Sequence, residues 1–440
     1  MTPGSAPEVS PGRAGRVPAW WLAVGAVLAV ALATRVAAVM ATRQYTPLTD
    51  ALNFDHIARS ILDGHGFGSA LVPPATGATA FRAPLFPVVL AGVYKVLGVS
   101  LLRARLFEAL VGALTVGLLG LVAAQIWGRR EALIAMAVSA VYPPLILMTT
   151  SLQWEVLFLP LLLGAIACAL AYRRRSDRLR LPIAAGCLLG LAALSRETGL
   201  LMVLPVGILV WQGARGARRP LLAVATVVGA MAVVLAPWVV RNEVRLDAFV
   251  PVSTSAGYAL AGTYNNSAAH LPGSPGQWTV PVDDPHLRGL VLARGHWTEP
   301  ELDAFFRRQS IAYLRHHPTY LGTLAVWNTV RLFDLRGPRD ALFISQYIPY
   351  RSGLVRLTVY AWYLGAALAV VGALTAKARR APWALWLAPL IVIASALFIV
   401  SGNIRYRQPI EPFVVLLAAL GVDALLTRVG RRIPFLERLA

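Results

Sequence analysis

The sequence predicts an all-α membrane protein that crosses the bilayer many times. Of its 440 residues, 57% are hydrophobic and only 14% are charged, whereas a soluble domain carries charge on roughly a quarter of its positions. Apolar runs recur along the chain, and a helix needs about 20 such residues to cross the hydrocarbon core. The runs are continuous rather than alternating, which excludes a transmembrane β-barrel.

Hydropathy predicts about ten membrane spans. They cover residues 19–40, 104–126, 131–150, 152–172, 182–195, 198–212, 220–238, 354–376, 382–401 and 407–427. Residues 1–18 are rich in Pro, Gly and Ser, and we expect a disordered cytoplasmic tail there. The first apolar run is too long for a signal-peptide core, so it should remain as an anchor. Residues 19–427 form one membrane domain in this interpretation, followed by a cytoplasmic tail, 428–440.

Five basic clusters between the spans predict the orientation of the chain. They are Arg129-Arg130, Arg173 to Arg175, Arg215 to Arg219, Lys377 to Arg380 and Arg428 to Arg432. A further apolar piece, 81–98, is short and contains Pro84 and Pro87. If this piece lies in the interface instead of crossing, all five clusters and both termini fall on the cytoplasmic side, as the positive-inside rule requires. We therefore expect 81–98 to be a juxtamembrane or re-entrant helix.

Two polar stretches are then left on the outer side. We call them segment 1 (residues 41–103) and segment 2 (residues 241–353). Segment 2 should contain an amphipathic helix at 299–314. Its stretch 320–335 is apolar but carries Arg331 and Asp334, so we expect it to lie on the surface.

The composition and motifs exclude several function classes. The net charge of +20 resides largely in the clusters between spans, which orient the protein and attract anionic lipid; we expect no nucleic-acid partner. No P-loop, GxGxxG, HExxH, GxSxG or CxxC is present. Cys168 and Cys187 fall inside predicted spans, and the histidines lack a ligand spacing, so we expect no dedicated zinc site.

Segment 1 begins with acidic residues in TDALNFDHIARSIL, directly after the first span. Helical spacing places Phe54, Ile57 and Ala58 on one face of this stretch. Asp50 is either a helix N-cap or a general base that faces an outward cavity. Asp55 lies one turn further on, where a solvated helix face is the simpler interpretation.

Glu155, in SLQWEVLF, is a lone carboxylate near the outer end of a span. An unpaired carboxylate is costly there, so Glu155 either pairs with an Arg or joins Asp50 in an acidic site. Arg196 and Glu197 are expected to form an internal ion pair.

Four arginines flank the outer ends of spans: Arg82 in FRAPLFP, Arg241 in APWVVRNE, and Arg405 and Arg407 in GNIRYRQP. The guanidinium presents a fork of donors that suits phosphate. Snorkelling to the interface is the alternative interpretation for each of them.

The order of these motifs resembles the C-type (GT-C) membrane glycosyltransferases, in the branch of the protein O-mannosyltransferases and the lipid A aminoarabinose transferase. FRAPLFP, LSRETGLL, APWVVRNEVRLDAFVPVSTSAGYALAGTYNN and RYRQPIEPF carry the resemblance, which extends over 19–427. It implies a GT-C-like bundle and an inverting transfer of sugar. The donor would be a polyprenyl-phosphate sugar, and the acceptor a hydroxyl on the outer face of the membrane.

The resemblance also implies roles for individual residues. The family's catalytic Asp matches Asp50, and its second acidic position matches Glu155. Relatives have adjacent acids at the first position, whereas Ala51 follows Asp50 here, so Asp55 remains the other candidate for the second carboxylate. The substrate-binding set would be Arg82, Arg241, Asn242, Tyr258, Arg405, Tyr406 and Arg407.

The partners follow from the same resemblance. We expect a lipid, glycan or protein acceptor, a bacterial plasma-membrane location, and an active site on the extracytoplasmic side. Arginines or a divalent metal ion would stabilise the leaving phosphate. The alternative function is a transporter or flippase of lipid-linked sugars, which would tend to show paired broken helices at mid-membrane.

Overall fold

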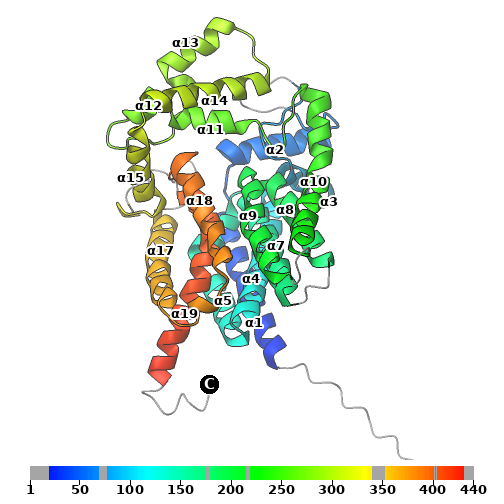
Figure 1. Ribbon diagram of the computed structural model, residues 1–440, viewed down its shortest axis with the longest axis vertical. Coiled ribbons are helices and arrows are strands. Elements are labelled where there is room, and N and C mark those ends of the chain that lie inside the picture. The colour runs from blue at the N-terminus through cyan, green and yellow to red at the C-terminus, as the bar shows by residue number, and fades with distance from the viewer. Residues whose placement is uncertain are drawn as a thin grey trace, which may run out of the picture.

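The computed structural model describes residues 19–68, 77–174, 179–214, 219–338, 352–400, 402 and 404–430. These residues form helices and connections; the strand-like pairing among them is one isolated bridge between Gly68 and Ala78. Long helices make a bundle, and shorter helices cover one end of it (Figure 1). The predicted all-α membrane fold class is confirmed.

The bundle contains six helices that are long and apolar enough to cross a membrane. Together with the shorter helices, the bundle is built from α1 (Ala19–Ala41), α4 (Leu101–Ile126), α5 (Arg129–Val141), α7 (Glu155–Arg174), α8 (Arg180–Ser195), α9 (Val203–Gly213), α10 (Arg219–Leu246), α17 (Ser352–Ala373), α18 (Leu387–Phe398) and α19 (Glu411–Gly430). The count rises to seven if a bent pair that starts with α5 is one span. The expected count of ten is not confirmed, because predicted spans 182–195, 198–212 and 382–401 form shorter apolar helices.

The predicted span 131–150 is broken at a pair of prolines. Helix α5 ends at Val141, and α6 (Pro143–Leu147) with η1 (Met148–Thr150) continues at an angle of 61°. A residue that precedes proline is pushed out of the helical region, and Tyr142 is accordingly extended, with φ −79° and ψ 109°. The turn leads the chain into the start of α7, where Glu155 lies.

Helices α17 and α19 pack in close contact. A Cβ atom added to Gly372 would lie 1.9 Å from the carbonyl oxygen of Leu417, and one on Gly421 would lie 2.2 Å from that of Leu368. Small residues allow backbones to approach in membranes, where packing rather than water exclusion drives association. The short helix η6 (Ile404–Ile410), which carries the RYR motif, leads directly into α19.

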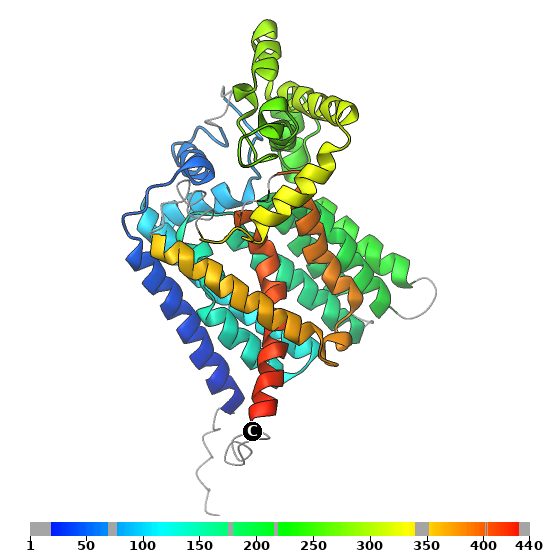
Figure 2. The same ribbon diagram turned by 90° about the vertical axis from the view of Figure 1, so that its left-hand side faces the viewer.

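The two ends of the bundle differ in their charges. At one end, which we call the basic end, Lys377 bonds Glu131 and Asp423 at 2.5 and 2.7 Å, and Arg130 bonds Asp423 at 2.7 Å. The described ends of the chain, the start of α1 and the end of α19, both lie there (Figures 1 and 2). Arg130 and Lys377, from two of the predicted basic clusters, therefore lie at the same end of the bundle.

The other end, the capped end, is covered by helices from both polar segments. They are α2 (Thr49–Leu62), α3 (Leu85–Leu97), α11 (Ser255–Thr263), α12 (Asn266–Ala269), η3 (Pro281–Asp283), α13 (Pro285–Arg294), α14 (Glu299–His316) and α15 (Tyr320–Leu332). Helix α3 has 13 residues, about 20 Å at 1.5 Å per residue, which is too short to cross. It packs on α2, as a juxtamembrane helix would. Helix α14 confirms the predicted amphipathic element.

Candidate active site at the capped end

Asp50 lies at the start of α2 and binds two arginines. The N-cap of α2 is Leu48, and no side chain caps the helix, so the N-cap interpretation of Asp50 is wrong. Thr49 has φ +50°, which is uncommon for a β-branched residue. Arg82 Nη2 donates to one carboxylate oxygen of Asp50, and Arg405 Nη1 donates to the other at 2.6 Å.

Aromatic rings hold the guanidinium of Arg82. Its Cζ lies 4.8 Å from the ring centre of Phe81 and 5.9 Å from those of Phe54 and Trp154. Cation–π attraction at such distances favours a charged group over a face of an aromatic ring. Phe54 belongs to the face of α2 that the sequence predicts to be apolar, and it is fully buried.

Glu155 joins the same cluster from the start of α7. Its Oε1 accepts from Trp154 Nε1 at 2.7 Å and from Arg196 Nη1 at 3.2 Å, and it lies 3.4 Å from Arg405 Nε. Arg405 therefore stands between the two carboxylates, Asp50 and Glu155. The two interpretations of Glu155, an arginine pair and an acidic site shared with Asp50, are both met by this arrangement.

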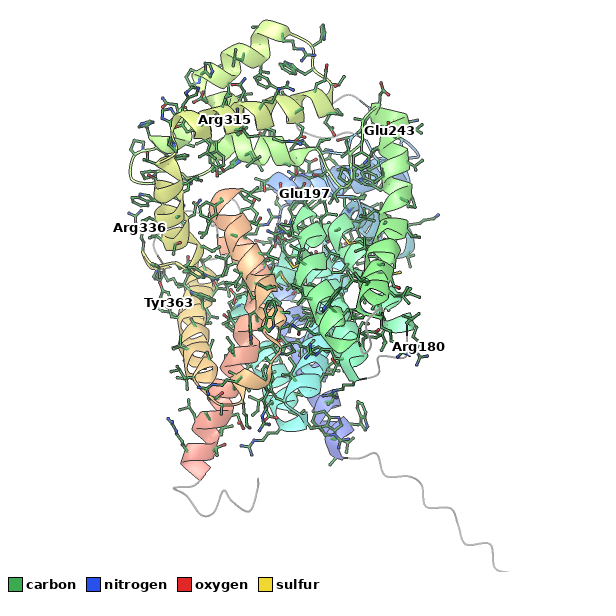
Figure 3. The ribbon with its side chains drawn as sticks, viewed as in Figure 1. Arg180, Glu197, Glu243, Arg315, Arg336 and Tyr363 are labelled. Atoms are coloured by element: carbon green, nitrogen blue, oxygen red, sulfur yellow. The ribbon has the colours of Figure 1, made fainter. Side chains whose placement is uncertain are left out.

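The expected ion pair between Arg196 and Glu197 is wrong. Arg196 is extended, with φ −153° and ψ 133°, and successive side chains of an extended backbone point to opposite sides. Arg196 consequently reaches Glu155, while Glu197 accepts from Ser253 and, at 2.6 Å, from Ser255 of segment 2. Figure 3 shows Glu197 between the bundle and the cap.

The cluster favours an anion. Arg82, Arg196 and Arg405 face Asp50 and Glu155, which leaves one positive charge in excess among these five residues. Burial alone would raise the pKa of Asp50, but the charges of Arg82 and Arg405 outweigh it and lower that pKa to about 2. Asp50 is thus an anion held by cations, and a competing anion such as phosphate would find guanidinium donors here.

Tyr406 and Tyr258 lie beside this cluster. The ring of Tyr406 is 5.5 Å from the Arg196 guanidinium carbon and 5.9 Å from that of Arg405. Tyr258 packs edge-on against Phe81 at 5.5 Å, and its burial raises the pKa of its hydroxyl. Tyr406 therefore lies beside two arginines of the cluster, and Tyr258 lies beside Phe81, whose ring contacts the third, Arg82.

Asp55 is directed away from the cluster. Its carboxylate accepts from Tyr94 of α3 at 2.5 Å and from Arg59 at 2.8 Å. The hydrogen bond from Tyr94 fastens α2 to α3, the pair with Arg59 lies within α2, and His56 is exposed. Of the two candidates for a second carboxylate, the structure brings Glu155, not Asp55, together with Asp50.

Arg241 and Asn242 bind loop backbone instead of the cluster. Arg241 donates to the carbonyl oxygens of Thr79 and Phe67, each at 2.7 Å, and Asn242 donates to that of Val250 at 2.9 Å. Helix α10 runs to Leu246, beyond the predicted end at 238. This extension carries both side chains up into the two polar segments.

Arg407 lies in a separate buried network. It donates to Asp334 at 2.7 Å, to Glu411 at 2.8 Å and to the carbonyl oxygen of Leu332 at 3.0 Å. In a 3₁₀ helix with about three residues per turn, side chains two residues apart point in different directions. Arg405 and Arg407 consequently point in different directions. Arg407 does not lie beside the other predicted site residues, contrary to expectation.

Sequence reasoning did not assign three residues of this region. Trp154 donates to Glu155, Arg196 pairs with it, and Glu299 bonds segment 1 at Thr79 and Ala80. The adjacency of Trp154 and Glu155 was the available signal for the first. No local pattern links Glu299 to residues about 220 positions earlier.

The donor set of this cluster does not suit a divalent cation. Asp50 and Glu155 already bind guanidinium groups, whose charge repels a metal ion. Within the described ranges no group of three His, Cys, Asp or Glu side chains could hold a metal.

Comparison with known proteins supports the fold. Residues 81–240, less than half of the chain, match a family model described as dolichyl-phosphate-mannose-protein mannosyltransferase. A search of curated proteins finds no match. The chain thus resembles the C-type membrane glycosyltransferases in part of its sequence.

Solved structures of that class share the architecture. The apo oligosaccharyltransferase of Archaeoglobus fulgidus superposes with a TM-score of 0.55 at 13% identity, covering 96% of this chain and 51% of its own. The complex of that enzyme, AglB, with an inhibitory peptide and a dolichol-phosphate gives 0.54 at 12% identity, covering 96% and 52%. ArnT from Cupriavidus metallidurans bound to undecaprenyl phosphate gives 0.45 at 16%, covering 95% and 80%.

The chain spans about half the length of the archaeal enzyme. At these identities the likeness concerns the fold alone. The molecule has the GT-C fold of membrane glycosyltransferases.

Proposed function

We propose that this protein is a glycosyltransferase that moves a sugar from a polyprenyl-phosphate donor to an acceptor hydroxyl. The reaction would take place at the outer face of a bacterial plasma membrane, with inversion at the anomeric carbon. The observation that carries the proposal is Asp50, held between Arg82 and Arg405 next to the buried Glu155. The family match over residues 81–240 and the GT-C fold support it.

Arg82 and Arg405 are the proposed ligands of the donor phosphate. Their side chains are 13% and 10% exposed, so they are reachable from the capped end but largely shielded from water. Charge-assisted hydrogen bonds from guanidinium to phosphate are strong in such surroundings. The net positive charge of the cluster favours a phosphate over a neutral ligand.

Asp50 is the proposed general base. In the resting state the two guanidiniums lower its pKa to about 2, which makes it a weak proton acceptor. A donor phosphate that shares those guanidiniums would withdraw part of their charge from Asp50 and raise its pKa. Binding of the donor would thereby activate the base.

The chemical step is then a single displacement. The acceptor oxygen bonds to the anomeric carbon as Asp50 takes its proton, and the bond from that carbon to the phosphate oxygen breaks on the opposite face. The polyprenyl phosphate leaves with the bonding electrons. It needs no proton, because Arg82 and Arg405 stabilise its added charge.

Glu155 is the proposed second carboxylate, with a positioning role. Its side chain is fully buried, and Oε1 binds Arg196 and faces Arg405. A carboxylate in this place holds Arg405 against Asp50 and balances one of the three arginine charges. The leaving phosphate is stabilised by arginines in this proposal.

Mass spectrometry of the glycans and glycolipids of a deletion strain tests the proposal. Complementation with the wild-type gene should restore a sugar-modified species that complementation with Asp50→Asn does not. Asp55→Asn is the matched control, because Asp55 lies on the same helix outside the cluster. Full restoration by Asp50→Asn would overturn the assignment of the base.

Reconstitution distinguishes the alternative function. If the purified protein moves lipid-linked sugar across a vesicle membrane without forming a glycosylated product, it is a flippase and the transferase proposal fails.

A further inference from the structure

We infer that Glu299, in segment 2, is a positioning residue for Arg82, and so controls how tightly the site binds a lipid phosphate. The inference rests on the proposed function of Arg82. Glu299 does not touch Arg82 in the hydrogen bonds and ion pairs of the described residues. It acts through the three residues that precede Arg82 in the chain.

Glu299 makes three hydrogen bonds to two distant parts of the chain. Its Oε2 accepts from Thr79 Oγ1 at 2.5 Å, and its Oε1 accepts from the Ala80 backbone N–H at 2.8 Å. The same Oε1 accepts from Thr254 Oγ1 at 2.6 Å. One carboxylate therefore joins segment 1, the start of α11 and the start of α14.

Further hydrogen bonds complete the hold on residues 79–81, which we call the clasp. The Thr254 N–H donates to the Ala80 carbonyl at 3.0 Å, Arg241 donates to the Thr79 carbonyl at 2.7 Å, and the Phe81 N–H donates to Thr79 Oγ1 at 3.0 Å. Thr79, Ala80 and Phe81 are all buried. Buried backbone groups need partners, and segment 2 and the end of α10 supply them.

Arg82 directly follows the clasp in the chain, so the backbone of the clasp fixes where the side chain of Arg82 starts. Arg has a long and flexible stem, so a fixed backbone and ring stacking decide whether its guanidinium stays at Asp50. Phe81 belongs both to the clasp and to the aromatic surroundings of Arg82, at 4.8 Å from its guanidinium carbon. Loosening the clasp would displace Phe81 and Arg82 together.

Capping of α14 does not explain Glu299. Thr298 accepts from the Glu301 N–H, and Glu301 accepts from the Thr298 N–H, which is a complete capping box. The helix start is thus satisfied without the side chain of Glu299. Glu301 lies two residues away with a 44% exposed side chain, and it provides a matched control.

The test measures binding of undecaprenyl phosphate to the purified full-length protein in nanodiscs, alongside donor kinetics. Glu299→Ala should weaken the binding about tenfold or more, because it removes charge-assisted hydrogen bonds. Glu299→Gln, which retains one acceptor oxygen, should weaken it less. Glu301→Ala should stay within about twofold of the wild type.

A double-mutant cycle tests the route through Arg82. Arg82→Ala alone should weaken binding, and Glu299→Ala added to it should have no further effect, since residues that act through one another are not additive. In turnover, the KM for the donor should rise more than kcat falls. Independent, multiplying effects of the two substitutions would overturn the inference.

Hydrogen exchange separates this inference from the proposed function. Glu299→Gln should speed exchange of the backbone amides of residues 79–82, and Glu301→Ala should not. If the wild type proves to have no transferase activity while this exchange result holds, the proposed function fails and the clasp remains. Unchanged exchange in Glu299→Gln contradicts the clasp itself.

Discussion

Arg405 and Arg407 stand two residues apart in one motif, yet they lie in two charge clusters with different access. Around Arg405 the side chains of Asp50, Arg82 and Arg405 are 16%, 13% and 10% exposed. Around Arg407 the side chains of Arg407, Asp334 and Glu411 are 1%, 3% and 1% exposed. Only the first cluster can be reached by a ligand without opening the bundle. The second fastens η6 and α19 to the end of α15.

One motif thus supplies one accessible arginine and one buried arginine. A fully buried ion pair contributes little beyond its desolvation cost, but losing one partner leaves an uncompensated charge. In a partly exposed ion pair, an anionic ligand can replace the carboxylate as the partner of the arginine.

Asp50→Asn should reduce sugar transfer by a factor of about 10² to 10⁴, the usual contribution of a general base. Protein abundance should stay near that of the wild type, because Asn has the shape of Asp and its amide oxygen can still accept from one of the two arginines. Turnover in reconstituted membranes with a radiolabelled donor measures the loss. A rate close to the wild-type rate would remove Asp50 from the chemistry.

Arg407→Ala should destabilise the fold by about 3–5 kcal/mol, because it leaves Asp334 and Glu411 buried without this cation. Arg405→Ala should instead weaken donor binding while more of the folded protein survives. Thermal unfolding in detergent and donor titration separate the two effects. If Arg407→Ala unfolds like the wild type and loses donor affinity, Arg407 belongs to the binding site after all.

The stability conferred by Asp50 should depend on pH. Its pKa in the folded protein is lowered to about 2, so its contribution is present above the ordinary pKa of the carboxyl and is lost as the pH falls through 2. The gap in unfolding free energy between wild type and Asp50→Asn should therefore narrow by about 1 kcal/mol between pH 6 and pH 3. Unfolding in denaturant at both pH values measures it, and a constant gap would show that Asp50 is not held by cations.

Lys377→Ala should change stability by less than about 1 kcal/mol and leave transfer intact. Lys377 lies at the basic end, where its side chain is 37% exposed and its partners are Glu131 and Asp423. Thermal unfolding and the transfer assay check both parts. A loss of transfer would mean that the two ends of the bundle are coupled.

Sequence patterns predicted much of the fold because membrane insertion depends on local composition. The sequence predicts the six long membrane helices, and most of the predicted ends lie within a few residues of the observed ends. These helices are α1, α4, α7, α10, α17 and α19. The span count failed where apolar runs form short helices, and 131–150 was broken by Pro143 and Pro144. Hydropathy predicts whether a segment lies in lipid or in water, but it does not predict how long the helix in that segment will be.

The sequence by itself determined the all-α membrane class and the candidacy of Asp50 and Glu155, since these depend on residue type along the chain. Only the tertiary structure decided that Arg405 meets Asp50 across 355 positions, that Arg196 pairs with Glu155 rather than Glu197, and that Glu299 holds Thr79. The reason is physical. The direction of a side chain at the end of a helix depends on backbone angles there and on the packing of distant helices, and neither leaves a periodic trace in the sequence.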